Sequence, residues 1–277
     1  MLRSLWTAKT GLDAQQTSLD TISNNLANVS TTAFKRARPV FEDLLYQNIR
    51  SAGLTENSGS SNPGDETFVP AGLQAGNGSR IVATQRINSA GSLLQSSNPL
   101  DMAINGNGYF VVDTGDGRAY TRSGNFMRGP TGNIVTPAGS TLLGSSGAPV
   151  TIPGNATDIV IGTDGTVTYY TGVNTPAVTL PNPIAIVNFV NPTGLSSVGG
   201  GLYFETTSSG PALSLPPGMM AGAGKPGFGS ISQYYTEQSN VNVAEELVSL
   251  IAAQRAYEIT AKSVSASDQI LQKLGQL

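Results

Sequence analysis

The chain has 277 residues, which suffices for one large domain or two to three small ones with a buried core. Charged residues make up only 12% of the chain and the net charge is −3, so the composition offers no basic surface for nucleic acid. Cysteine and histidine are both absent, which excludes disulfides, metal sites built from these residues, and catalysis by Ser-His-Asp or Cys-His groups.

A first helix is predicted near the N-terminus, over residues 3–29. Its heptad positions form two columns of the kind that line a coiled-coil seam. One column contains Leu5, Leu12, Leu19 and Leu26, and the other contains Ala8, Gln15, Ile22 and Val29. No apolar run of about 7 to 15 residues marks a secretory signal, and no stretch approaches the roughly 20 apolar residues of a membrane span. We therefore expect a chain that is cytoplasmic or is exported without losing a signal peptide.

Residues 35–79 have a different composition. Lys35, Arg36 and Arg38 precede a short apolar stretch at 40–49, and residues 51–78 are rich in Gly, Ser, Asn and Pro. Such a composition is typical of a mobile linker or a surface loop. We therefore expect a connecting segment here.

From residue 80 to about residue 235 the apolar pattern approaches a period of two and is broken by turn residues, which predicts an all-β domain. The expected strands lie at 80–87, 108–113, 118–122, 159–161, 167–170, 184–190 and 202–206. Asp116-Gly117 and Asp164-Gly165 predict short hairpins, because these residues tolerate the positive φ of primed turns. Residues 218–229 are expected to form a flexible return to a second helix.

The second helix is predicted over residues 240–277 and carries the matching seam. Its two heptad columns contain Val243, Leu250, Tyr257, Val264 and Leu271, and Leu247, Gln254, Ala261 and Asp268. Asn240 is expected to cap the first turn of this helix, where Glu245 and Glu246 place negative charge near the positive end.

Two matching helical ends around a β-rich middle predict an α+β protein. We expect the terminal helices to pair as an antiparallel coiled coil, a stalk that carries a mainly β outer domain. The expected divisions are 1–34 for the N-terminal helix, 35–79 for the connecting segment, 80–235 for the β domain and 236–277 for the C-terminal helix.

Several apolar residues lie outside the two seams, namely Trp6, Val248, Ile251, Ile259 and Ile270. Apolar surface left on a thin stalk must be covered by something. Self-assembly is the economical hypothesis. Binding to a membrane surface is the alternative, although the polar faces of the helices are not rich in the Lys and Arg that such binding uses.

Motifs at both ends of the chain resemble those of a known family. The stretch SNNLANVSTTAFKR, residues 23–36, is similar to the N-terminal signature of bacterial flagellar rod and hook proteins, and SNVNVAEELVSLIAAQRAYE, residues 239–258, is similar to their C-terminal one. RSLWTAKTGLDAQQ near the start, AINGNGYFVV at 103–112 and YTRSGNF at 120–126 most closely resemble the distal-rod members. The resemblance covers roughly the whole chain. Ala33 stands where the family usually has glycine, so a left-handed backbone is disfavoured there.

The resemblance implies a structural subunit of the distal rod, a hollow helical shaft that joins the proximal rod to the hook inside the periplasmic and outer-membrane rings. It implies self-polymerisation, contacts with the proximal-rod, hook and ring proteins, and export to the basal body by the flagellar type III route. In the family, the segment matching 35–79 packs against adjacent subunits and helps to keep the rod straight. The expected assembly interface consists of Leu5, Leu12, Leu19, Ile22, Leu26, Val243, Leu247, Leu250, Tyr257, Val264 and Leu271.

No catalytic, cofactor-binding or metal-binding residues are expected. The Gly-Asn-Gly sequences at 76–78 and 106–108 lack the third glycine and following helix of a dinucleotide fingerprint, and they are interpreted as turns. A glycosidase using Asp158, Asp164 and Glu205 would need aromatic sugar platforms, whereas the single Trp lies in the stalk. Two alternatives stay open: a proximal-rod or hook subunit of the same family, and a secreted β-domain enzyme or adhesin.

Overall fold

The computed structural model describes residues 2–52, 55–56, 67–68, 71–172, 176–213, 223–224 and 227–274. The chain forms two compact units. The first unit consists of Met1–Asn24, Ala37–Gln85 and Ala244–Leu277, and the second consists of Asn25–Arg36 and Arg86–Val243. Two long helices belong to the first unit and most strands to the second, so the predicted α+β class is confirmed.

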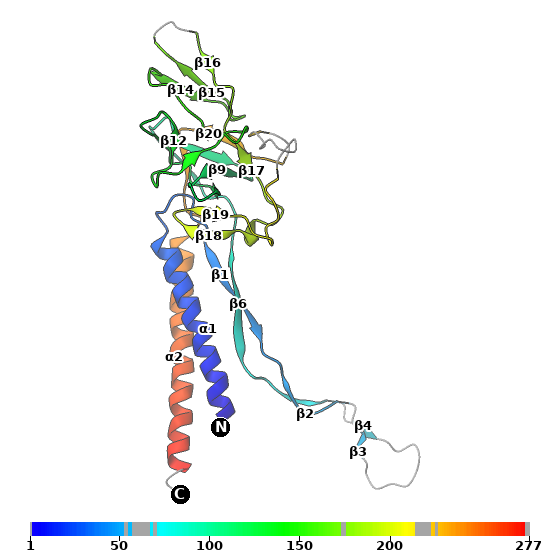
Figure 1. Ribbon diagram of the computed structural model, residues 1–277. Helices are drawn as coiled ribbons and strands as arrows, with labels where there is room; N and C mark the ends of the chain where they lie inside the picture. Colours follow the sequence, from blue (N-terminus) through cyan, green and yellow to red (C-terminus); the bar gives the residue numbers. More distant parts are fainter. Residues whose placement is uncertain are drawn as a thin grey trace. The chain divides into compact units, whose positions relative to one another are not determined.

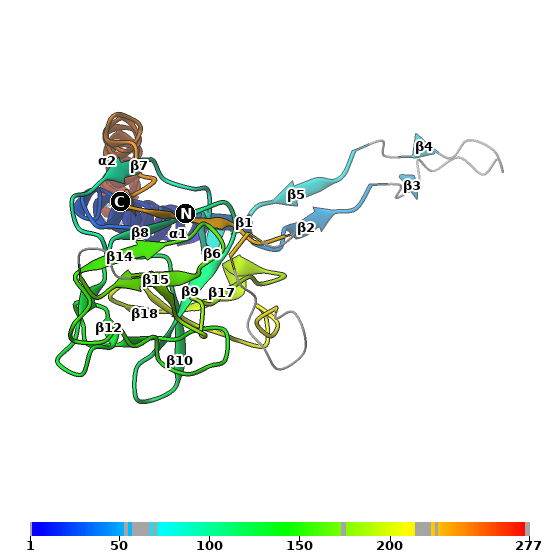
Figure 2. The same cartoon turned by 90° about the horizontal axis from the view of Figure 1, so that it is seen from above.

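The two long helices are α1 (Leu2–Ala27) and α2 (Val243–Leu274). They lie side by side and run in opposite directions (Figure 1, Figure 2). They approach closely at Gly11, where an added Cβ would lie 3.5 Å from Cγ2 of Thr260. Ala14 of α1 and Ala253 of α2 are also buried. Small side chains therefore make the contact between the two helices at this point.

The first unit also contains a ribbon of paired strands (Figure 1). The pairs are β1 (Ala37–Asp43) with β6 (Ser79–Arg86), β2 (Gln47–Arg50) with β5 (Leu73–Ala75), and β3 (Thr55–Glu56) with β4 (Thr67–Phe68). The ribbon rests on α1, because an added Cβ at Gly78 would lie only 2.1 Å from Oγ1 of Thr10. Arg3 of α1 also donates a hydrogen bond to the carbonyl oxygen of Gly76 at 3.2 Å.

The ribbon differs from the linker or surface loop that the composition of residues 51–78 suggested, since β3, β4 and β5 lie in the described part of that stretch. The composition suggested a loop because few of these residues are apolar. Pairing satisfies the backbone N–H and C=O groups whatever the side chains are, so a polar ribbon is stable once its partner strand is in place. Residues 53–54, 57–66 and 69–70 lie outside the described residues, as do most of residues 218–229.

The second unit is built from short strands in several small sheets. Its strands are β7 (Leu93–Gln95), β8 (Met102–Asn105), β9 (Tyr109–Asp113), β10 (Arg118–Thr121), β11 (Met127–Arg128), β12 (Ile134–Val135), β13 (Thr141–Leu142), β14 (Asp158–Ile161), β15 (Val167–Tyr170), β16 (Val178–Thr179), β17 (Ile186–Val187), β18 (Ser196–Gly199), β19 (Leu202–Phe204), β20 (Ser230–Gln233) and β21 (Tyr235–Glu237), with a 3₁₀ turn at Pro192–Gly194. The largest sheet has the order β11-β12-β13-β9-β10-β19-β18, and β17 also pairs with β9. The strands β14, β15 and β16 form a second sheet, while β20 pairs with β8 and β21 with β7.

The core of the second unit lies on both faces of β9. Phe110 and Val112 belong to one hydrophobic cluster, and Tyr109 and Val111 belong to another. This alternation follows from the period of two of a β-strand, whose successive side chains point to opposite faces. The ring of Phe110 meets that of Phe126 edge-on, with 5.3 Å between the ring centroids.

Most of the predicted strands are confirmed, because β6, β9, β10, β14, β15 and β19 lie at the expected positions. The stretch 184–190 is the exception, since only Ile186–Val187 is a strand there. Both predicted hairpins are confirmed, with β9 antiparallel to β10 and β14 antiparallel to β15. Gly117 and Gly165, in their turns, have φ angles of +142° and +84°. The hairpins therefore lie where the dipeptides predicted them, but only the glycine of each dipeptide has a positive φ, so the turns are not the primed turns that were expected.

Candidate functional site

Three charged side chains meet in the interior of the second unit. Glu237, at the end of β21, accepts a hydrogen bond from Nζ of Lys35 at 2.5 Å and one from Nε of Arg122 at 2.7 Å. All three side chains are buried. We call Lys35, Arg122 and Glu237 the ion cluster.

Backbone groups complete the hydrogen bonding of the ion cluster. The N–H of Gly91 donates to Oε1 of Glu237 at 2.8 Å, and Nζ of Lys35 also donates to the carbonyl oxygen of Ser89 at 2.8 Å. The Arg122 guanidinium donates to three carbonyl oxygens at the turn between β8 and β9, those of Ile104 at 3.2 Å, Gly106 at 2.6 Å and Gly108 at 2.9 Å. Buried charges are costly unless they are paired and hydrogen-bonded, and here both conditions are met.

The charges of the cluster control the protonation of its members. Burial by itself would raise the pKa of Glu237, but the positive charges of Arg122 and Lys35 and their hydrogen bonds hold this pKa below its ordinary value. For Lys35, burial lowers the pKa, and the charge of Glu237 opposes that effect. Glu237 is therefore a carboxylate at neutral pH, the form that accepts hydrogen bonds from all of its donors.

The segment that follows α1 is fastened beside the ion cluster. The N–H of Ala33 donates to the carbonyl oxygen of Glu237 at 2.8 Å, and the side chain of Ala33 is buried. Ala33 has a φ of +57°, so the expectation that its Cβ disfavours a left-handed backbone there is wrong. The conformation costs about 1–2 kcal/mol for a non-glycine residue. The hydrogen bond to Glu237 and the burial of the methyl group offset this cost.

The segment that precedes α2 is fastened at the same place. Oδ1 of Asn240 accepts a hydrogen bond from the backbone N–H of Arg36 at 2.7 Å, and Nδ2 donates to the carbonyl oxygen of Ile87 at 2.8 Å. Since α2 begins only at Val243, the prediction that Asn240 caps this helix is wrong. Its side chain instead joins three segments that are far apart in the sequence.

The ion cluster has the properties of a structural element. Its carboxylate is enclosed and already accepts hydrogen bonds from Lys35, Arg122 and Gly91, so no substrate can reach it. Among the described residues, no group of three His, Cys, Asp or Glu side chains is placed to hold a metal ion. The cluster holds distant segments of the chain together.

The exterior of the first unit offers a different kind of site. Val248, Ile251, Ile259 and Ile270 are all exposed on α2. At 3.6 residues per turn Val248 and Ile251 lie opposite to Ala253, and Ile259 and Ile270 lie roughly 100–120° around the helix from it. We call these four residues the outer stripe. One side of α2 therefore contacts α1, while the opposite side presents apolar residues that the chain itself leaves uncovered.

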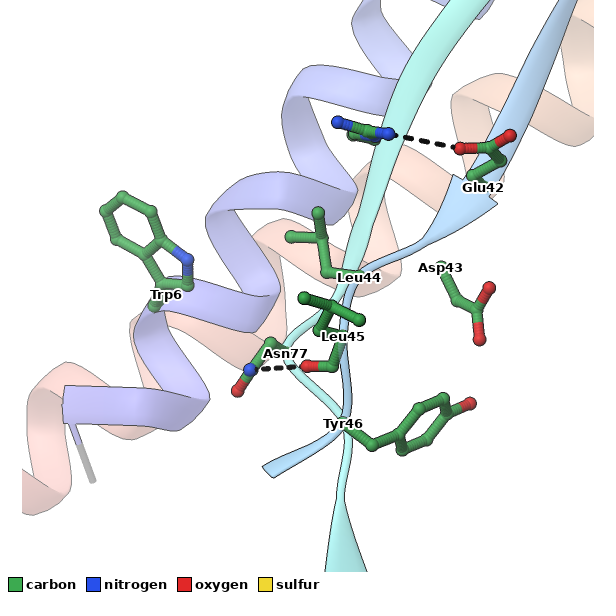
Figure 3. Close-up of a pocket in the computed structure, with 8 residues that line it drawn as sticks. Trp6, Glu42, Asp43, Leu44, Leu45, Tyr46 and Asn77 are labelled. Carbon is green, nitrogen blue, oxygen red and sulfur yellow. Dashed lines mark hydrogen bonds and ion pairs between the residues drawn. The ribbon is translucent and has the colours of Figure 1, made fainter. Parts of the chain in front are cut away.

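A pocket of about 670 Å³ lies between α1 and the ribbon of the first unit. Figure 3 shows Trp6 contributed by α1, and Asp43, Leu45 and Tyr46 contributed by the chain at the end of β1. Leu45 is 89% exposed and Trp6 is 58% exposed. The side chain of Asn77 donates to the carbonyl oxygen of Leu45 at 2.7 Å and so fixes this part of the ribbon (Figure 3). We call this feature the ribbon pocket.

Comparison with known proteins identifies the family. Three family models match, namely "Flagella basal body rod protein" at 5–35, "Flagellar hook protein FlgE/F/G D1 domain" at 103–169 and "Flagellar basal body rod FlgEFG protein C-terminal" at 232–277. The chain is 48% identical to the flagellar basal-body rod protein FlgG of Buchnera aphidicola over the full length of both chains. The chain belongs to the flagellar basal-body rod protein family. The FlgG proteins of Caulobacter vibrioides and Bacillus subtilis are 42% and 37% identical, with 100% of this chain and 99% of each relative covered.

A rod protein with these relatives is a structural subunit of the flagellar distal rod and not an enzyme. Its place is the flagellar basal body. None of the helices that the structure describes is long and apolar enough to span a membrane.

The expected assembly residues of this rod protein differ in their environments within one chain. Ile22 is buried. The partly buried ones are Leu5, Leu12, Leu19, Leu26, Leu250 and Val264. The exposed ones are Val243, Leu247 and Tyr257. The side chain of Leu271 lies outside the described residues. A subunit interface at these positions stays a prediction.

The sequence pattern did not reveal the ion cluster. Lys35 lies near the end of the first family signature, and Arg122 lies in the stretch at 120–126. Glu237 lies outside all of the stretches that resemble the family, two residues before the C-terminal signature at 239–258. The available signal was that Arg122 is the one charged residue of the stretches at 103–112 and 120–126. Pairing Lys35 with Glu237 still requires the fold, since 202 positions separate them.

Proposed function

We propose that this rod protein polymerises with copies of itself into a hollow helical shaft that transmits torque from the motor to the hook. The terminal helices, in the divisions 1–34 and 236–277, pack as antiparallel coiled coils in the inner part of the shaft. The segment 35–79 packs against adjacent subunits, and the β domain at 80–235 forms the outer part. The assembly residues lie along both helices, from Leu5 to Leu26 and from Val243 to Leu271.

The observation that supports polymerisation is the uncovered side of α2. Ile259 and Val248 are each 68% exposed, although the opposite side of the same helix already contacts α1. Exposed apolar residues gathered on one side of a helix mark a surface that a partner covers. Copies of the same chain cover the outer stripe in this proposal.

The proposed partners follow from the place of the subunit in the basal body. Proximal-rod and hook proteins lie at the two ends of the shaft, and the periplasmic and outer-membrane ring proteins surround it. The flagellar type III apparatus exports the subunit unfolded. The absence of cysteine from the sequence fits this route, because no disulfide has to be broken before the chain passes through a narrow channel.

Electron cryomicroscopy of the concentrated full-length chain tests the proposal. Straight hollow filaments are expected from the full chain, and none are expected from a chain that lacks residues 1–34 and 240–277. A full-length chain that stays monomeric at high concentration would contradict polymerisation.

A matched pair of variants keeps the test independent of a gross deletion. Val248→Ser with Ile259→Ser removes the two most exposed residues of the outer stripe and should abolish filaments. Val190→Ser with Val198→Ser makes the same chemical change at two exposed residues of the second unit, and filaments should persist. Circular dichroism of both variants establishes that they remain folded.

A further inference from the structure

The ribbon pocket combines apolar side chains with an acidic residue that lacks a partner. Trp6, Leu45 and Tyr46 provide exposed apolar surface. Glu42 at its rim is paired with Arg80 at 3.3 Å. Within the residues that the structure describes, the side chain of Asp43 has no hydrogen bond or ion pair. The pocket therefore suits an apolar segment that carries positive charge.

The outer stripe of α2 has the matching pattern. Ile259 lies at its centre, and Arg255 and Lys262 lie one turn before and one turn after it on the same side of the helix. Both basic residues are exposed. One acidic residue, Glu258, lies on this side as well, roughly 20° around the helix from Ile251 and roughly 40° from Lys262, so the basic residues there outnumber the acidic one by two to one. An amphipathic helix that presents such anchors to a groove is a common mode of recognition.

The two surfaces cannot meet within one chain. The ribbon pocket is lined by α1 and the ribbon, whereas the outer stripe lies on the side of α2 that points away from α1. They can meet only between copies. Since the pocket and the stripe are different surfaces, the contact is heterologous, and such contacts build rings or open helical filaments and not closed dimers.

We infer that the ribbon pocket of one subunit receives the outer stripe of α2 from a second copy of this chain, with Ile259 against Tyr46 and Leu45 and with Arg255 or Lys262 against Asp43. The inference rests on the proposed polymerisation and deepens it, because it names both surfaces of one subunit contact.

Disulfide trapping tests the contact directly, because the natural chain contains no cysteine and gives no background. The double variant Tyr46→Cys with Ile259→Cys is polymerised, oxidised and run on a denaturing gel without reductant. A ladder of covalent dimers, trimers and longer species is expected. Tyr46→Cys with Gln254→Cys is the matched control, because Gln254 is exposed on another side of α2, and it should remain monomeric.

The outcomes separate the contact from polymerisation itself. Filaments without a ladder would overturn the inference and leave the proposed function intact. Covalent dimers from either single variant, Tyr46→Cys or Ile259→Cys, would show a symmetric contact and would also overturn it. If the full chain forms no filaments, the proposed function fails and the inference fails with it.

Charge reversal provides a second measurement. Asp43→Lys should raise the critical concentration for polymerisation roughly two- to fivefold, as expected for one partly exposed ion pair. Adding Arg255→Glu or Lys262→Glu to the Asp43→Lys chain should restore the original value in at least one case. Asp116→Lys makes the same change in net charge on a hairpin of the second unit and should leave the critical concentration unchanged. Equal effects of Asp43→Lys and Asp116→Lys would overturn the inference.

Discussion

Replacing Glu237 by glutamine should destabilise the second unit more than any other single carboxyl-to-amide change there. The carboxylate accepts hydrogen bonds from Lys35 at 2.5 Å, Arg122 at 2.7 Å and Gly91 at 2.8 Å. Glutamine keeps one acceptor oxygen and turns an NH₂ group toward one of the cations. At least one charge-assisted hydrogen bond is then lost, at about 1.5–3 kcal/mol, and two buried cations lose their counter-charge.

Breaking a buried ion pair by removing one partner typically costs about 3–5 kcal/mol. For a unit of roughly 150–250 residues, each kcal/mol lowers the unfolding midpoint by about 2–4 °C, so a decrease of roughly 6–20 °C is expected. Thermal and urea unfolding at neutral pH, followed by circular dichroism, measure this change. Glu205→Gln is the matched control, because the carboxylate of Glu205 accepts a single hydrogen bond from Tyr120 at 3.1 Å. Its cost should stay near 1 kcal/mol.

The difference between the natural chain and Glu237→Gln also depends on pH. The pKa of Glu237 is lower in the folded state than its ordinary value, so its stabilising effect is fully present above the ordinary carboxyl range near about 4.3. That effect is lost as pH falls through the lower, folded-state pKa. A loss below about 1 kcal/mol at neutral pH, or a difference that grows on acidification, would refute the assigned role of the ion cluster.

Three further predictions concern the second unit. Ala33→Gly should change the free energy of unfolding by less than about 1 kcal/mol, because relief of the left-handed strain offsets the lost methyl burial and the added chain entropy. Ala33→Val should cost about 2 kcal/mol or more, because a β-branched side chain fits a left-handed backbone poorly. Urea unfolding of both variants measures these changes. Gly124→Ala should cost several kcal/mol or prevent folding, since the new Cβ would lie 1.4 Å from the carbonyl oxygen of Met102, and soluble yield with circular dichroism reports it. Burial above all raises the pKa of Tyr109 and of Tyr120 to about 12, and it also raises the pKa of Tyr203. These three phenols should resist ionisation in a spectrophotometric titration, and the stability that they contribute should fall as pH rises above about 10.

Local patterns in the sequence were sufficient to predict the helices and many of the strands. The heptad columns predicted α1 and α2, and the dipeptides at Asp116 and Asp164 predicted two hairpins, because each of these signals is contained in a few neighbouring residues. The strands of the ribbon other than β6 were missed because they pair across a long intervening segment, as in the register of Asn48 with Gln74, and because residues 51–78 are rich in Gly, Ser, Asn and Pro. No pattern within a short window contains that information.

The ion cluster, the ribbon pocket and the outer stripe could not be predicted from the sequence for a related reason. A Lys, an Arg and a Glu attract one another only when the fold brings them within a few ångströms, and burial decides whether the attraction matters. The left-handed backbone of Ala33 was predicted wrongly because the cost of a Cβ is local, whereas the hydrogen bond to Glu237 that offsets it is not. The excess apolar residues of α2 were visible in the sequence, but the side of the helix that they occupy relative to α1 was not.

The pairing of Lys35 with Glu237 has a consequence for the order in which a new subunit matures. These two residues are 202 positions apart in a chain of 277, so the bond between them closes most of the chain into a loop. Closing a loop of that length costs roughly 5 kcal/mol of chain entropy before any contact compensates it. A chain that emerges unfolded from a narrow channel cannot close this loop until both ends of the loop are outside, whichever end leads. In the proposed export route the ion cluster therefore forms late, after nearly all of the subunit has left the channel.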